Sequence, residues 1–253
     1  MKITFLGTGT SQGVPVIGCD CSVCQSIDFK DKRLRSSIHL ETDKLSVIID
    51  IGPDFRQQVL RANLKWLDAV LLTHEHKDHT AGLDDIRSFN FKQKMDMPVY
   101  GRKHVLEQLK KEFAYIFSEK KYPGVPRLVL KEIDNGEFSI NEQKILPVEV
   151  MHYKLPVYGF RFDSFAYITD AKTISEEEIS KLAGLEVLVL NALQHKPHIS
   201  HLTLSEALDL ARRIGAKQTY LTHISHNLGL SREVESELPE GVSLAFDGQQ
   251  LEL

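Results

Sequence analysis

The residue types best suited to metal chemistry gather in one short stretch, THEHKDH at residues 73–79. It holds His74, His76 and His79 together with Asp78. The preceding run AVLLT is typical of a buried strand, on which residues two apart face the same side. His74 and His76 should therefore share one face, and Asp78 and His79 should follow where the next helix begins. Four such side chains could bind two metal ions side by side; the alternative is an exposed polar loop.

All three cysteines lie within six residues, in the stretch IGCDCSVCQS. An odd number cannot pair completely in disulfides, and clustered thiols in a reducing compartment more often hold a metal. Three thiolates need one further nitrogen or sulfur ligand to complete a tetrahedral zinc site. The alternative is a set of buried or reactive free thiols. The spacing of Cys19, Cys21 and Cys24 favours a structural zinc site with a fourth ligand from elsewhere.

The composition suits one domain spanning residues 1–253. The chain is 42% hydrophobic, and its net charge of −4 argues against non-specific binding to nucleic acid. The apolar part of MKITFLG is too short for a signal peptide, and no stretch approaches the ~20 apolar residues of a membrane span. We therefore expect a soluble cytoplasmic protein without a membrane partner.

The elements that must position these residues alternate along the chain. Strands are predicted at 2–9, 36–43, 45–52, 69–74, 97–101, 127–133, 143–152, 158–163, 164–171, 185–193 and 218–223. Helices are predicted at 53–64, 79–89, 104–117, 175–184 and 203–216, and a hairpin turning on Asp247 and Gly248 closes the chain. Ser175 and Thr203 are expected N-caps. The pattern predicts an α/β fold with two sheets inside and helices outside.

The H-x-H-x-D-H motif at residues 74–79 resembles the signature of the metallo-β-lactamase superfamily, and the resemblance covers almost the whole chain. It implies an αββα sandwich, in which two mixed β-sheets are flanked by helices. It implies one metal site at His74, His76 and His152, and a second at Asp78, His79 and His223. It further implies that Asp170 bridges both ions and that Asp50 is a structural acid beside them.

The stretch YLTHISH offers a fourth ligand for the cysteines. His226 follows His223 by three residues and could complete a Cys₃His zinc site; the alternative is a solvated loop histidine. Within the superfamily, this arrangement and the loop GTGTSQG at residues 7–13 resemble the cyclic phosphodiesterase branch of the carbon–phosphorus lyase pathway. Gly7, Gly9 and Gly13 allow close approach to a phosphate, or simply form a tight turn.

The stretch HLT at residues 201–203 resembles the phosphodiesterase branch, which includes tRNA 3′-processing endonucleases. That resemblance implies that His201 assists at the scissile phosphate, although it could instead cap its helix. No role is assigned to His195 and His198 in the same loop, and His39 and His104 are expected to be ordinary strand and helix residues. After the motif come three charged residues that could orient ligand histidines, contact a phosphate or form surface ion pairs: Asp84, Asp85 and Arg87.

The resemblance implies a dinuclear metal-dependent phosphodiester hydrolase. Two Zn²⁺ or Mn²⁺ ions would take part in catalysis, and one Zn²⁺ would stabilise the fold. Asp78 would orient the attacking hydroxide, and a protonated His201 would act on the leaving oxygen. The negative charge and the absence of a long basic insertion favour a small, cyclic phosphodiester over tRNA, and the resemblance implies a homodimer. The alternatives are a thioester or lactone hydrolase, a tRNA 3′-processing endonuclease, and a non-catalytic metal-binding interaction protein. The last is disfavoured because all seven ligand positions are filled.

Overall fold

Two mixed sheets form the interior of the molecule. The computed structural model describes residues 1–120 and 122–253, and within them each sheet has seven strands. The first sheet has the order β14-β1-β2-β3-β4-β5-β6. Its strands are β1 (Lys2–Gly7), β2 (Ser37–Glu41), β3 (Ser46–Ile49), β4 (Ala69–Leu71), β5 (Met97–Gly101), β6 (Leu128–Glu132) and β14 (Gln250–Glu252).

The second sheet has the order β13-β12-β11-β10-β9-β8-β7. Its strands are β7 (Phe138–Ile140), β8 (Gln143–His152), β9 (Leu155–Phe162), β10 (Phe165–Ile168), β11 (Val187–Asn191), β12 (Gln218–Thr222) and β13 (Val242–Leu244). Strands β10 to β13 are parallel, whereas β8 pairs antiparallel with β9. Strand β7 was not predicted, because Phe138–Ile140 is too short to show an alternating pattern.

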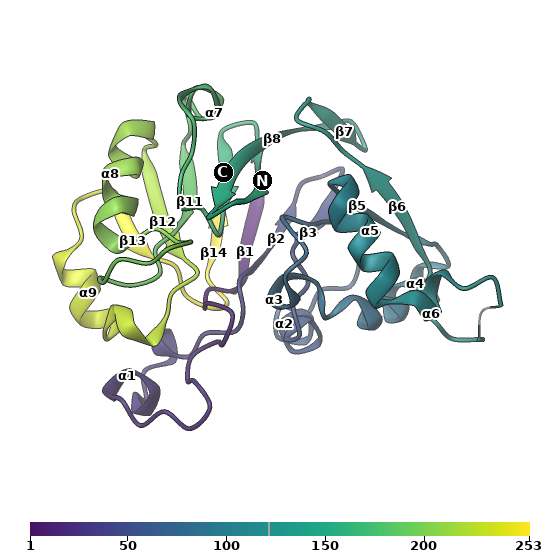
Figure 1. Cartoon of the computed structure of the whole chain (residues 1–253), viewed down its shortest axis with the longest axis horizontal. Coiled ribbons are helices and arrows are strands. Elements are labelled where there is room, and N and C mark those ends of the chain that lie inside the picture. Colours follow the sequence, from purple (N-terminus) through teal and green to yellow (C-terminus); the bar gives the residue numbers. More distant parts are fainter. Residues whose placement is uncertain (121) are drawn as a thin grey trace.

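Helices cover the outer face of each sheet. Figure 1 shows α8 and α9 at one end of the molecule and α4 and α5 at the other. The α-helices are α1 (Ser22–Gln25), α2 (Phe55–Arg61), α3 (Lys77–Thr80), α4 (Arg87–Gln93), α5 (Lys103–Glu112), α6 (Ala114–Phe117), α7 (Glu176–Ser180), α8 (Leu204–Ile214) and α9 (Ser231–Glu237). The 3₁₀ helices are η1 (Phe29–Asp31), η2 (Leu83–Ile86) and η3 (His226–Leu228). None of the helices in residues 1–120 and 122–253 has the length and apolar character needed to cross a bilayer.

Three apolar clusters correspond to the three contacts between four layers. Phe5 of the first sheet and Phe160 and Tyr167 of the second belong to the cluster between the sheets. A second cluster joins the first sheet to its helices, and a third packs α8 on the second sheet. Alternate strand residues supply the inner and outer clusters, as the two-residue period of a strand requires. The predicted αββα sandwich is confirmed.

Helix α8 shows how local signals set an element in place. The hydroxyl of Thr203 accepts the backbone N–H of Glu206, whose carboxylate accepts the backbone N–H of Thr203. This capping box begins the helix immediately after His201. Gly215 ends it at φ +71°, a left-handed conformation that glycine adopts without strain. Both predicted caps, Ser175 and Thr203, are therefore present.

The predicted helix at 79–89 is wrong, because the chain breaks there into α3, η2 and α4. The amide of Gly82 donates to the carbonyl of Ile51 at 2.8 Å and leaves the helical pattern. A Cβ at Gly82 would lie 2.3 Å from the carbonyl oxygen of Gly52. Contact with the segment after β3 therefore decides the break.

The predicted closing hairpin is also wrong, because β13 and β14 belong to different sheets. The Asp247 carboxylate accepts the amide and hydroxyl of Thr8 and the amide of Leu34. Gly248 donates its amide to Phe5. These bonds carry the chain from the second sheet to the edge of the first, where β14 pairs with β1.

Candidate metal centre

The candidate site lies where strands of both sheets end. Asp50 directly follows β3, and His152 ends β8. Asp170 is the second residue after β10, and His223 directly follows β12. Asp50, Asp170 and His223 have φ values of +63°, +58° and +56°. Residues other than glycine seldom adopt this left-handed conformation, and strain of this kind clusters at functional sites.

The structure brings together all seven side chains that the resemblance implies as ligands. His74, His76 and His152 offer nitrogen atoms within 4.8 Å of one another. Asp78, His79 and His223 form a second such group. Asp170 belongs to one group with His74 and His79 and to another with His152 and His201, so it lies between the two sets.

The distances suit a cation between the facing atoms. Two ligands at about 2.0–2.1 Å from a tetrahedral Zn²⁺ lie about 3.3 Å apart. His74 Nε2 lies 3.0 Å from His76 Nδ1. The Nε2 atoms of His79 and His223 each lie 3.3 Å from an Asp170 oxygen, and His79 Nε2 lies 3.1 Å from Asp78 Oδ2. These two buried nitrogens have no hydrogen-bond partner in the described part of the chain. The donor set therefore fits divalent metal ions.

Asp50 selects the tautomers of two histidines. Its carboxylate accepts the amide of Thr73 at 2.9 Å, the hydroxyl of Thr73 at 2.8 Å and His79 Nδ1–H at 2.7 Å. Because the Thr73 hydroxyl donates to Asp50, its oxygen accepts His74 Nδ1–H, at 2.9 Å. Both imidazoles are thereby left with an Nε2 lone pair facing the site.

His152 is oriented in the same way by the backbone. Its Nδ1–H donates to the carbonyl of Ser200 at 2.9 Å, which leaves Nε2 as the acceptor. Sequence reasoning did not identify Thr73 or Ser200. Thr73 directly precedes the motif and could have been found as a strand-end hydroxyl, whereas nothing in the sequence indicates which carbonyl meets His152.

The electrostatic field of the site favours anionic carboxylates. Burial opposes charge on His79, but Asp170, Asp78 and Asp50 outweigh it and raise its pKa well above the usual value. Burial alone would raise the pKa of Asp78 and of Asp170, but the neighbouring histidines lower both well below the usual range. Burial lowers the pKa of His74 and of His152, so these two imidazoles are neutral and offer lone pairs beside the ionised carboxylates. A bound divalent cation would replace the proton that the surrounding carboxylates hold on His79, and imidazoles with carboxylates are the ligands of Zn²⁺ and Mn²⁺ sites.

A close backbone contact holds the motif in place. A Cβ at Gly52 would lie 2.0 Å from the carbonyl oxygen of Asp78. The segment after β3 can therefore pass the H-x-H-x-D-H turn only because residue 52 has no side chain. Ile51 adds a hydrogen bond from its amide to the carbonyl of His79, at 2.8 Å.

The three cysteines and His226 form a separate cluster. His226 Nδ1 lies 3.2, 3.4 and 3.5 Å from the Sγ atoms of Cys19, Cys21 and Cys24. Ligands at about 2.3 Å (sulfur) and 2.0–2.1 Å (nitrogen) from a tetrahedral Zn²⁺ lie about 3.6 Å apart. The amide of Cys24 donates to Cys21 Sγ and is the largest influence that lowers the pKa of Cys21, to about 6. Burial raises the pKa of Cys24 to about 11, so of these two thiols only Cys21 favours thiolate without a metal ion. The four facing atoms have the spacing of a tetrahedral zinc site.

The glycine-rich loop lies against the strand end that carries His223. Thr10 donates its amide to the carbonyl of Ile224, and Ile224 donates its own to Thr8. A Cβ at Gly7 would lie 1.9 Å from the carbonyl oxygen of Arg35, and one at Gly9 would lie 2.9 Å from that of Arg33. Gly7 and Gly9 therefore allow close packing of the backbone, as in the tight-turn interpretation, and are not needed for contact with a phosphate. The loop lies between the cysteine cluster and the candidate centre.

His201 is buried against the seven side chains. Its Nδ1 lies 3.7 Å from Asp170 Oδ1 and has no hydrogen-bond partner in residues 1–120 and 122–253. Its ring lies 4.6 Å from that of His152 and stacks at 4.7 Å on that of His223. It does not cap α8, since Thr203 does so. His198 lies beside it, with ring centroids 5.1 Å apart, whereas His195 donates its Nε2–H to the carbonyl of Leu228 at 2.8 Å.

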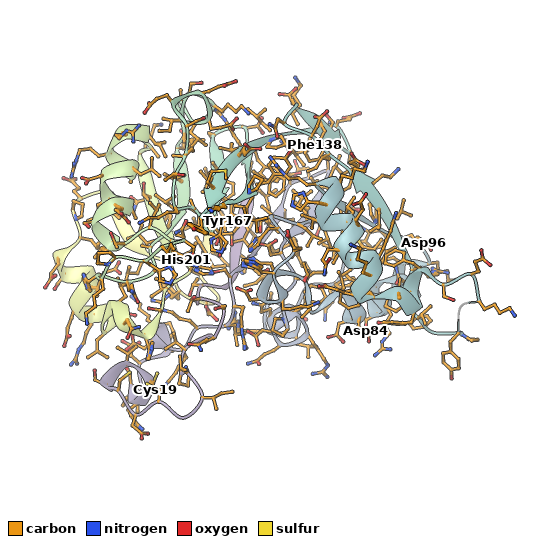
Figure 2. The ribbon with its side chains drawn as sticks, in the orientation of Figure 1. Cys19, Asp84, Asp96, Phe138, Tyr167 and His201 are labelled. Atoms are coloured by element: carbon orange, nitrogen blue, oxygen red, sulfur yellow. The ribbon has the colours of Figure 1, made fainter. Side chains whose placement is uncertain are left out.

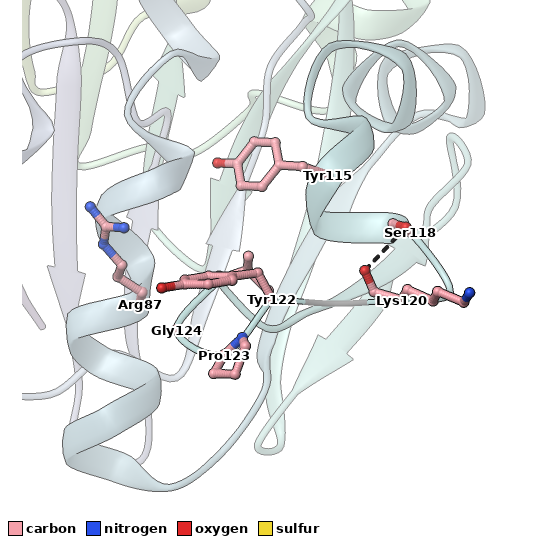
Figure 3. A pocket seen from close by; sticks show the side chains of 8 residues that line it. Arg87, Tyr115, Ser118, Lys120, Tyr122, Pro123 and Gly124 are labelled. Atoms are coloured by element: carbon pink, nitrogen blue, oxygen red, sulfur yellow. Dashed lines mark hydrogen bonds between the residues drawn. The ribbon is translucent and has the colours of Figure 1, made fainter.

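Asp84, Asp85 and Arg87 do not reach the histidines. Asp84 pairs with Arg87 at 3.0 Å and accepts the Tyr115 hydroxyl, and Figure 2 shows it well away from His201. Asp85 lines a groove between α2 and α4. Arg87 lines a cavity of about 530 Å³ with Tyr115 and Tyr122 (Figure 3). The surface ion pair is thus the correct alternative for Asp84 and Arg87, and Asp50 is the acid that orients a histidine.

The two remaining histidines are ordinary, as expected. His39 is buried in β2 and hydrogen-bonds to Ser46 Oγ at 2.8 Å. His104 lies in α5, with Nε2 3.5 Å from a Glu75 oxygen. Neither belongs to a cluster that could hold a metal ion in the described residues.

Comparison with known proteins settles the family. A family model described as a β-lactamase superfamily domain matches residues 46–224. The chain belongs to this superfamily of metal-dependent hydrolases. A solved structure of a new diphosphatase from the PhnP family is 41% identical, with a TM-score of 0.93 over 100% of this chain and 97% of that one. The expected membership and fold are confirmed, and this likeness agrees with the phosphodiesterase branch.

Two relatives with other names also match. An octanoyltransferase of Porphyromonas gingivalis is 40% identical over 98% of this chain and 51% of that protein. A ribonuclease Z of Anoxybacillus flavithermus is 23% identical over 288 residues, covering 89% of this chain and 87% of that protein. The chain spans about half the length of the first two curated relatives it matches, the octanoyltransferase and a ribonuclease Z of an Exiguobacterium species.

Proposed function

We propose that the chain is a dinuclear metal-dependent phosphodiesterase that acts on a small cyclic phosphodiester. The observation that carries the proposal is the position of His201. Asp170 and the six groups around it suffice to hold two ions, so His201, buried against Asp170 with an unpaired Nδ1 in the described part of the chain, is left to act on substrate.

The metal ligands are proposed as two sets. His74, His76 and His152 would hold one ion, Asp78, His79 and His223 would hold the other, and Asp170 would serve both. Bound divalent cations would lower the pKa of a water molecule and offset negative charge on the substrate phosphate. Zn²⁺ and Mn²⁺ both suit this set of imidazoles and carboxylates. The Cys₃His cluster has four ligands and no open position, so its Zn²⁺ would be structural.

Two side chains act on the reacting atoms in this proposal. Asp78 would accept a hydrogen bond from the attacking water and orient it toward phosphorus. The new P–O bond forms as the bond to the leaving oxygen breaks, and the proton that the water loses ends on that leaving oxygen. His201 donates a ring N–H to the leaving oxygen. Burial, followed by the nearby His223, lowers the pKa of His201 to about 3. We therefore assign it the role of a neutral hydrogen-bond donor in place of the imidazolium expected from the sequence.

A second candidate is hydrolysis of a diphosphate, because a diphosphatase is 41% identical over the full chain. The same site could act on a P–O–P bond, since phosphoanhydride and phosphodiester both present a phosphate between two oxygens. Precursor tRNA is less well supported. The alignment with the Anoxybacillus ribonuclease Z runs over 288 residues, more than the 253 here, so that relative has segments this chain lacks. The octanoyltransferase name belongs to a protein twice as long and is not carried over.

The decisive assay compares substrates on protein loaded with Zn²⁺ or Mn²⁺. We expect turnover of a 2′,3′-cyclic nucleotide and of bis(p-nitrophenyl) phosphate, and none of S-lactoylglutathione. Faster turnover of a diphosphate-bridged dinucleotide would favour the second candidate, and cleavage of precursor tRNA alone would overturn the proposal. The small-phosphodiester partner, the homodimer, the single domain and the cytoplasmic location stay predictions.

The role of His201 has its own test. We expect His201→Ala to keep both ions of the pair and to lose about 10²–10⁴-fold in kcat on bis(p-nitrophenyl) phosphate. His104→Ala, a histidine outside the clusters, is the matched control. Turnover of His201→Ala equal to that of wild type would remove this residue from the reaction.

A further inference from the structure

Tyr153 adopts a backbone conformation that bulky residues rarely take. Its φ is +57°, in the two-residue turn between β8 and β9, where the last strand pair joins His152 to Leu155. Glycine and asparagine are favoured at such positions because a crowded Cβ destabilises the turn. Tyr153 is also 52% exposed, so burial offers little compensation. A strained aromatic residue next to His152 points to a functional role.

A second exposed apolar side chain lies beside the same histidine. Ser200 accepts His152 Nδ1–H through its carbonyl, and the neighbouring Ile199 is 66% exposed. Tyr153 and Ile199 are thus each one residue from this hydrogen-bonded pair. Lys154, which is exposed in the same turn, lies with its Nζ 5.4 Å from the Tyr153 ring centroid.

We propose that Tyr153 and Ile199 hold the aromatic base of a nucleoside-containing phosphodiester at the rim of the candidate metal centre. This inference rests on the proposed function and names its substrate class. An aromatic ring stacks on any base, so the contact selects for a nucleoside without selecting its sequence. Lys154 adds positive charge beside the Tyr153 ring, which favours an anionic substrate.

The test uses a substitution that should stabilise the fold while weakening binding. In Tyr153→Asn we expect KM for a 2′,3′-cyclic nucleotide to rise about tenfold, from loss of one base–aromatic stack. KM for the base-free cyclic phosphate of glycerol should not change, and kcat for both should remain within about twofold. The melting temperature should rise by about 1–3 °C, because asparagine tolerates the positive φ.

Lys94→Asn is the matched control. Lys94 is an exposed residue at φ +57°, at the end of α4 and outside the candidate centre. It should gain a similar rise in melting temperature with no change in either KM. Ile199→Ser should raise KM for the nucleotide only, by a smaller factor of about threefold.

Binding separates failure of this inference from failure of the proposed function. Calorimetry with a nucleoside monophosphate on metal-loaded protein should show about tenfold weaker binding in Tyr153→Asn. If neither substrate is turned over but binding weakens in this way, the proposed function fails and the base contact stands. Equal nucleotide affinity in wild type and Tyr153→Asn, or equal effects on both substrates, would overturn the inference.

Discussion

Replacing Asp50 by asparagine tests whether this buried acid positions the metal ligands. All three partners of the carboxylate are donors: the Thr73 amide, the Thr73 hydroxyl and His79 Nδ1–H. Asparagine has one acceptor oxygen, and its NH₂ group would face at least one of these donors. A buried donor left unpaired costs about 1–3 kcal/mol, and the charge-assisted bond to the carboxylate is lost as well.

We therefore expect Asp50→Asn to lose about 2–3 kcal/mol of folding free energy and about 10–100-fold in metal affinity. The second figure is the usual effect of removing a partner that orients a ligand histidine. Metal affinity is measured by competition with a chromophoric chelator, and stability by urea unfolding of metal-free protein.

Asp68→Asn is the matched control for Asp50→Asn. Asp68 accepts the Ser46 amide and the Trp66 indole N–H, both at 2.8 Å, in the same sheet but with no histidine partner. It should lose stability and keep wild-type metal affinity. If both variants bind metal as wild type does, the orienting role of Asp50 is refuted.

Three further outcomes are expected. Cys21→Ser should hold one ion fewer per chain by elemental analysis, and its melting temperature should fall because the metal links α1 to η3. Gly52→Ala should lower metal affinity at least tenfold by chelator competition, because its Cβ would meet the Asp78 carbonyl at 2.0 Å. Burial lowers the pKa of His39 to about 4. Between about pH 6.5 and pH 4, His39 is therefore protonated in the unfolded state but neutral in the folded state. Stability present above pH 6.5 should decline by up to about 3 kcal/mol as the pH falls to 4, and in His39→Gln the urea-unfolding difference between these pH values should shrink.

Several elements were predictable because their signals are local. The Thr203 cap and the left-handed Gly215 delimit α8 within the sequence of the helix itself. The apolar run AVLL at residues 69–72, which contains β4, and the apolar run of β11 identify buried strands. The closing turn was misassigned because Asp247-Gly248 has the composition of a hairpin turn, whereas Asp247 is bound to Thr8, 239 residues away.

By itself, the sequence identified two candidate metal sites: a strand-end motif with fixed spacing and three clustered thiols. These features depend on neighbours along the chain, so they can be read without a fold. The assignment of His152, Asp170 and His223 to the first site came from the family resemblance. Only the tertiary structure decided that Asp50, and not Asp84 or Asp85, orients a histidine, and that the helix after the motif breaks at Gly82. Both depend on contacts between segments whose approach is set by the packing of two sheets, and no local pattern encodes that geometry.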